Sequence, residues 1–215
     1  MLKINMNSEL IKRFYKIIQD INDNINSENY KSALGSVEEA FKEFFRLDSK
    51  FFNSLSEDNL LDIIKTNNIM DLYKCIIMSK LLMEEGIIYE KLYGENKSFY
   101  LYQKSLYLYI EALLNFDEES EINQYKSDIK ILIDKLSEYK LSYKLQKQIV
   151  SYCIKEGEYD NAENFVYEML QDSREDYKEY AISFYKELLS KDDDDLNKGR
   201  LPREEIIESL GSLEK

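Results

Sequence analysis

One proline and six glycines among 215 residues restrict the folds open to this chain. Sheet proteins need many tight turns, and those turns depend largely on glycine and proline. Helices disfavour both residues in their interiors, so a helical protein explains their scarcity more simply. The sequence therefore predicts an all-α protein. Its length allows one large domain or two small ones, and we expect a single domain over residues 1–215.

Apolar residues recur at helical spacing along almost the whole chain. Ser8 is placed to cap a first helix, and Ser54 with Glu57 reads as a capping box for a short one. A last helix follows Pro202. The first helix carries Leu10, Ile11, Phe14, Tyr15, Ile17, Ile18, Ile21 and Ile25, and further helices are predicted at about 28–45, 57–65, 70–92, 97–116, 119–138, 141–156, 159–171 and 174–190. About ten helices with short connections are typical of an α-solenoid, which is an array of helical hairpins.

Four consecutive aspartates precede the last helix, at positions 192–195. Leu196 and Asn197 break the pattern that a calcium-binding EF-hand loop would need. We therefore interpret residues 191–199 as a solvated acidic linker.

The most informative pattern is a packing unit that occurs three times. Its members are spaced 3, 4 and 3 residues apart, as expected for one face of a helix. The copies are Tyr30, Ala33, Val37 and Ala40; Tyr102, Ser105, Tyr109 and Ala112; and Tyr159, Ala162, Val166 and Met169. A small residue at the second position would let another helix approach closely.

This pattern resembles the second helix of the tetratricopeptide repeat. The best match is the stretch from Lys155 to Glu163, in which Gly157 supplies a turn between paired helices. The copies lie about 72 and 57 residues apart, whereas the tetratricopeptide period is about 34, and Met169 replaces the last small residue. We interpret the chain as an irregular tetratricopeptide-like array with added helices. A generic helical bundle is the alternative, because 3-4-3 is the period of any helix.

Three segments also resemble a family of bacterial proteins of unknown function. These are residues 46–49, residues 53–61 and the terminal stretch 199–205. Members of that family are similar in length, entirely helical and tetratricopeptide-like. The resemblance implies the fold, and it supplies no catalytic residues.

The net charge of −13 argues against a nucleic-acid partner, because phosphate binding needs clustered lysine and arginine. The first residues lack the apolar core of a signal peptide, and no apolar run approaches the ~20 residues of a membrane span. Cys75 and Cys153 form no CxxC pair. We expect a cytoplasmic protein with no membrane partner.

Histidine is absent, which removes the commonest general base and the commonest metal ligand. No glycine-rich phosphate loop is present. Adjacent carboxylates such as Glu84 and Glu85 point about 100° apart on a helix and cannot share a site. We therefore expect no enzymatic activity and no catalytic, cofactor or metal site.

Four tyrosines lie within residues 98–112, the stretch SFYLYQKSLYLYIEA. A helical projection places Tyr102 and Tyr109 on the apolar side, with hydroxyls expected to reach polar partners. Tyr100 and Tyr107 project onto a polar strip. They are candidate surface anchors for a partner, or half-exposed rings packed on lysine stems or covered by an added helix.

A basic stripe is the second candidate site. Lys140, Lys144, Lys147, Ser151 and Lys155 fall within roughly 80° of each other on the helical projection. This is the first helix of the best-matched unit, the helix that lines the groove in tetratricopeptide proteins. The stripe could capture an acidic peptide or a terminal carboxylate, or it could be a solvated face that balances nearby acidic residues.

These observations predict an interaction protein that binds a protein or peptide partner in a helical groove. The alternative is a regulatory or sensor module that binds a small ligand or signal peptide there. Self-association is compatible with either role, because surplus apolar surface on a short array is often covered by a second copy.

Overall fold

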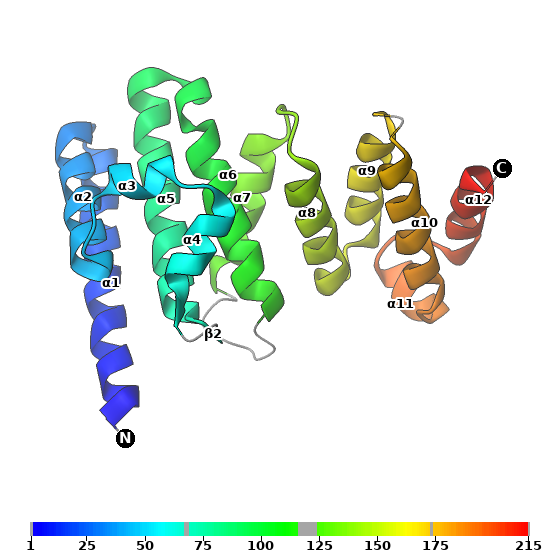
Figure 1. Ribbon diagram of the computed structural model, residues 1–215, viewed down its shortest axis with the longest axis horizontal. Helices are drawn as coiled ribbons and strands as arrows, with labels where there is room; N and C mark the ends of the chain where they lie inside the picture. Colours follow the sequence, from blue (N-terminus) through cyan, green and yellow to red (C-terminus); the bar gives the residue numbers. More distant parts are fainter. Residues whose placement is uncertain (1, 67–68, 116–123, 173, 215) are drawn as a thin grey trace. The chain divides into compact units, whose positions relative to one another are not determined.

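The computed structural model describes residues 2–66, 69–115, 124–172 and 174–214. Twelve helices account for nearly all of this described part, which confirms the predicted all-α helical array (Figure 1). The chain divides into two compact units, Met1–Tyr139 and Lys140–Lys215, where the sequence predicted one domain. No helix in the described ranges is both long enough and apolar enough to cross a membrane.

The first unit contains seven helices and one short hairpin of strands among its described residues. The helices are α1 (Leu2–Asn26), α2 (Tyr30–Phe45), α3 (Ser49–Ser54), α4 (Glu57–Ile64), α5 (Leu72–Tyr93), α6 (Glu95–Asn115) and α7 (Lys126–Leu136). Strands β1 (Lys65–Thr66) and β2 (Ile69–Met70) pair antiparallel between α4 and α5.

The second unit contains five helices among its described residues. They are α8 (Tyr143–Glu156), α9 (Tyr159–Leu170), α10 (Glu175–Leu189), α11 (Asp193–Lys198) and α12 (Arg203–Leu213). Within this unit α9 packs on α8, α10 packs on α9, and α12 packs on α10.

Two of the predicted helix caps are wrong. Helix α1 already begins at Leu2, so Ser8 lies within it. Helix α4 is capped by Ser56, whose Oγ accepts from the Asn59 backbone N–H at 3.3 Å. Ser54 instead ends α3, a short helix that Asp48 caps and that the periodicity did not separate from its neighbours.

The repeated packing unit lies on the second helix of three hairpins. Helix α1 packs on α2, α5 packs on α6, and α8 packs on α9. Eleven of the twelve positions are buried, and Tyr30 is half-buried. The buried positions are Ala33, Val37, Ala40, Tyr102, Ser105, Tyr109, Ala112, Tyr159, Ala162, Val166 and Met169. The spacing therefore marks the faces on which the hairpins pack.

Close contact between α5 and α6 depends on small residues on both helices. Ser105 Oγ on α6 donates to the Ser79 carbonyl on α5 at 2.7 Å. The Tyr102 ring lies against Gly86, where an added Cβ would come within 2.6 Å of Tyr102 Cε1. Tyr102 and Tyr109 are core residues, as predicted. Their hydroxyls donate to Glu90 Oε2 at 2.5 Å and to Asp128 Oδ2 at 3.2 Å.

The prediction of an acidic linker at 191–199 is wrong, because this segment forms α11 and docks on its own unit. Asp192 caps the helix, and Leu196 is fully buried. Asp195 Oδ2 accepts from the Tyr159 hydroxyl at 2.6 Å, and Asp193 pairs with Arg203. The aspartates are thus used to cap and attach a helix.

We expect Gly86→Ala to lower the free energy of unfolding by about 1–3 kcal/mol, because its methyl group would overlap the Tyr102 ring. Gly35→Ala is the matched control. Gly35 also lies within a helix, and a Cβ added there would have no atom within 4 Å. Gly35→Ala should therefore stabilise α2 by about 1 kcal/mol. Urea unfolding of both variants measures the two effects. Equal stability of the two variants would contradict this account of the α5–α6 contact.

Candidate functional site

The two tyrosines predicted as surface anchors have different environments. Tyr100 is 67% exposed, and its ring packs edge-on against Phe99. Tyr107 is only 3% exposed, and its hydroxyl donates to Asp58 Oδ1 at 3.1 Å. The prediction of Tyr107 as a surface anchor is therefore wrong, and the two rings do not form a paired site.

The reason is that α4 packs on α6, and α3 contacts the polar strip of α6 through Asn53. The strip includes Lys104, whose ammonium donates to the Asn53 carbonyl on α3 at 2.6 Å. Asp58 on α4 accepts from Tyr107, and the Asn53 side chain donates to Glu85 Oε1 on α5 at 2.8 Å. A segment of the chain itself therefore covers this face.

Glu84 and Glu85 are both buried on α5 but do not share a site, as their spacing predicted. Glu84 pairs with Lys80 at 3.0 Å, and Lys80 also pairs with Asp128 at the start of α7 at 2.8 Å. Glu85 instead meets Asn53 on α3. The Oε2 atom of each carboxylate is buried and lacks a hydrogen bond within the described residues.

Burial raises the pKa of Glu85 to about 7, and the nearby charge of Glu38 adds to the rise. The hydrogen bond from Asn53 opposes it. Burial also raises the pKa of Glu84, against the opposing effect of Lys80. Glu85 is therefore a buried acid that titrates near neutral pH and holds part of the contact with α3.

The basic stripe on α8 is only partly continuous. Lys140 precedes the helix, because Ser142 caps α8 at its start, and its ammonium pairs with Asp172 at 2.9 Å. Lys144 and Lys155 are exposed on the helix. The projection that grouped Lys140 with the others therefore does not apply to it.

Lys147 occupies a different environment from the other stripe residues. Its ammonium lies 5.2 Å from the centroid of the Tyr143 ring and 4.8 Å from that of the Tyr180 ring on α10. No carboxylate in the described chain pairs with it. Two aromatic rings therefore position the Lys147 ammonium, and no carboxylate of the described chain neutralises its charge.

A small pocket of about 180 Å³ lies beside this cluster, between α8 and α10. Ser151 lines it, and the Ser151 hydroxyl also donates to the Lys147 carbonyl at 3.0 Å. The full lining is Ser151, Ile154, Tyr180, Ser183, Phe184 and Glu187. The pocket is smaller than a typical drug-sized site and suits a single side chain.

Sequence reasoning missed the tyrosines that complete this surface. Tyr143 stacks on Tyr177 of α10 with ring centroids 4.6 Å apart, and meets Tyr180 edge-on at 6.2 Å. Tyr177 and Tyr180 are three residues apart on one helix face, and Tyr143 precedes Lys147 by four. The sequence contains both spacings, but neither spacing predicts that side chains of α8 and α10 contact each other.

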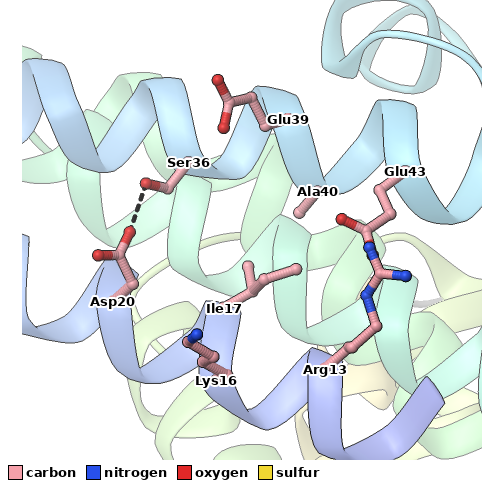
Figure 2. A pocket seen from close by; sticks show the side chains of 8 residues that line it. All are labelled: Arg13, Lys16, Ile17, Asp20, Ser36, Glu39, Ala40 and Glu43. Carbon is pink, nitrogen blue, oxygen red and sulfur yellow. Dashed lines mark hydrogen bonds and ion pairs between the residues drawn. The ribbon is translucent and has the colours of Figure 1, made fainter. Parts of the chain in front are cut away.

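A larger groove of about 380 Å³ lies between α1 and α2 (Figure 2). One end is closed by Ser36 Oγ, which donates to Asp20 Oδ2 at 2.7 Å. The other end is closed by the ion pair of Arg13 and Glu43 at 2.6 Å. The remaining lining residues are Lys16, Ile17, Glu39 and Ala40. Sequence analysis assigned Ile17 and Ala40 to helix packing but indicated no site here, because exposed charges on two helices give no signal until the helices pair.

Among the described residues, no group of three histidine, cysteine, aspartate or glutamate side chains could hold a metal ion. Cys75 on α5 and Cys153 on α8 are buried and form no disulfide. Neither thiol is placed for surface chemistry.

The chain matches, over residues 1–215, a family model described as a family of unknown function (DUF6483). No curated protein matches the chain, and no solved structure matches it. The family description names no site residues.

We expect Glu85→Gln to flatten the dependence of stability on pH. The folded pKa of about 7 lies above the ordinary value of 4.5, so the folded chain keeps a proton that the unfolded chain releases. This contribution is complete below about pH 4.5 and is lost as pH rises through 7. Between pH 5 and pH 8 the wild type should lose about 2 kcal/mol more than Glu85→Gln.

Urea unfolding at the two pH values measures this difference. Glu9→Gln, an exposed change of the same chemistry on α1, is the control and should follow the wild type. The same pH dependence in Glu85→Gln and the wild type would show that Glu85 does not titrate in this range.

Proposed function

We propose that this chain, which belongs to the family of unknown function DUF6483, is a non-catalytic interaction module that binds an acidic protein or peptide segment on the face formed by α8 and α10. The single observation that carries the proposal is the Lys147 ammonium, held by two tyrosine rings and paired with no carboxylate of the described chain.

The charge of Lys147 suits recognition of a carboxylate. Positioning an ammonium before binding lowers the entropy lost when a ligand is bound. A hydrogen bond between this ammonium and a carboxylate is charge-assisted, and so is stronger than one between neutral groups. The lysine thus supports recognition of an acidic side chain or a terminal carboxylate.

The pocket beside Lys147 supplies a second recognition element. Ile154 and Phe184 provide apolar contact, and Ser151 and Ser183 provide hydroxyl groups. Glu187 at this pocket disfavours a second acidic group there. The ligand that fits best is a segment with an apolar side chain next to an acidic residue.

The hairpin arrangement supports the same role. Helices α8 and α10 carry the tyrosine contacts across this face, and α9 holds the packing unit behind α8. This is how a tetratricopeptide-like array would present a peptide-binding groove, with first helices lining it and second helices forming the packed layer. The whole proposal concerns residues of the second unit alone.

We expect Lys144→Glu/Lys147→Glu to weaken binding of such peptides at least about tenfold, because a favourable charge becomes a repulsive one. Fluorescence anisotropy with labelled peptides that carry an apolar residue beside an aspartate or glutamate measures this. Matching peptides with asparagine or glutamine test the need for the charge.

The control is Lys31→Glu/Lys198→Glu, which makes the same charge change at exposed positions outside this face. It should bind as the wild type does, and all variants should remain folded at the temperature of the binding measurement. Binding that survives the first double variant, or that both double variants weaken alike, would overturn the proposal.

A further inference from the structure

Two oppositely charged side chains, one from each helix, line the groove between α1 and α2. Lys16 lies on the α1 side, and Glu39 lies on the α2 side (Figure 2). Neither side chain forms an ion pair or a hydrogen bond within the described part of the chain. The other charged groups of the lining are engaged, since Arg13 pairs with Glu43 and Asp20 accepts from Ser36.

The space between these charges has an apolar floor. Ile17 of α1 and Ala40 of α2 line the groove between its two closed ends, and Ala40 is 1% exposed (Figure 2). The contacts at the two ends, Asp20 with Ser36 and Arg13 with Glu43, join the two helices there. The groove is therefore bounded at both ends and presents a cation, an apolar surface and an anion.

This arrangement selects among classes of ligand. A purely anionic ligand would meet the unpaired charge of Glu39, and a purely cationic one would meet that of Lys16. An uncharged apolar ligand would desolvate both charges without pairing them. A ligand with one ammonium and one carboxylate pairs both at once.

The volume limits the size of that ligand. About 380 Å³ lies near the lower end of the ~300–1,000 Å³ range of small-molecule sites. A molecule of one or two amino-acid residues suits this space. Lys16 and Glu39 are exposed, so binding should be weak and should fall as salt concentration rises.

We propose that this groove binds a small zwitterion with an apolar body, an amino acid or dipeptide with free termini. Its ammonium group pairs with Glu39, its carboxylate pairs with Lys16, and its apolar side chain packs on Ile17 and Ala40. This site lies wholly in the first unit and is independent of the peptide-binding face proposed for α8 and α10.

The dipeptide Leu-Leu is the probe, and amide chemical shifts of the full-length labelled protein are the measurement. We expect saturable shifts centred on residues 13–20 and 36–43. N-acetyl-Leu-Leu lacks the ammonium and Leu-Leu-amide lacks the carboxylate, so each should bind at least about tenfold more weakly.

Two variants test the two walls, and both change exposed residues outside the packed core. Lys16→Met and Glu39→Gln should each weaken Leu-Leu binding about tenfold. Lys12→Met and Glu9→Gln, equivalent changes at exposed positions of α1 outside the groove, should leave it unchanged. Lys144→Glu/Lys147→Glu should also bind Leu-Leu normally, which separates this site from the face of α8 and α10.

The absence of saturable shifts with Leu-Leu would overturn the proposal. Equal binding of the blocked dipeptides would do so too, because it would show that the charges take no part. Shifts centred outside α1 and α2, or binding that is insensitive to Lys16→Met and Glu39→Gln, would place any ligand elsewhere.

Discussion

The contact between α5 and α6 is the constraint on which the rest of the first unit depends. Twelve residues of α5 are buried: Cys75, Ile76, Ile77, Met78, Ser79, Leu81, Leu82, Met83, Glu84, Glu85, Gly86 and Ile88. A helix buried on so many sides needs neighbours in several directions. Helix α6 covers one side at close range, since Gly86 and Ser79 leave room for Tyr102 and Ser105. Helices α2, α4 and α1 also contact α5.

Two adjacent buried carboxylates on α5 then determine how the neighbouring segments attach. Glu84 reaches α7 through Lys80 and Asp128, and Glu85 reaches α3 through Asn53. Burying a charge is costly, so each carboxylate stabilises only an arrangement that supplies its partner. Glu84 and Glu85 therefore contribute more to the positions of α3 and α7 than to the free energy of unfolding. Because burial raises the pKa of Glu85 to about 7, its contact with α3 is expected to depend on pH near neutrality.

The two proposed binding surfaces follow different chemical rules. On α8 and α10 aromatic rings position one ammonium beside a pocket for a single side chain, which suits a segment of a larger partner. Between α1 and α2 a lysine of one helix and a glutamate of the other line a groove with an apolar floor, which suits a small zwitterion. Each surface is formed by two helices of one unit and is completed only when those helices pair.

The sequence by itself determined the helices and the faces on which they pack. Turn residues are scarce, which predicted helices. Because the period of a helix is a local property, spacing alone predicted the three packing units and the core positions of Tyr102 and Tyr109. Helix ends were less well predicted, because a cap depends on a single side chain, and Ser54 and Ser56 are equally suitable in sequence.

Only the tertiary structure decided what covers each exposed strip. A helical projection shows which way Tyr107 and Lys104 point, but not that α3 and α4, about fifty residues earlier in the chain, lie over them. The sequence likewise predicted solvated aspartates at 192–195. In the structure Asp195 accepts from Tyr159, and Asp193 pairs with Arg203. The same holds for the surfaces at Lys147 and in the groove between α1 and α2. The physical reason is that periodicity records the orientation of a side chain, whereas burial and charge pairing depend on which distant segment comes to lie against it.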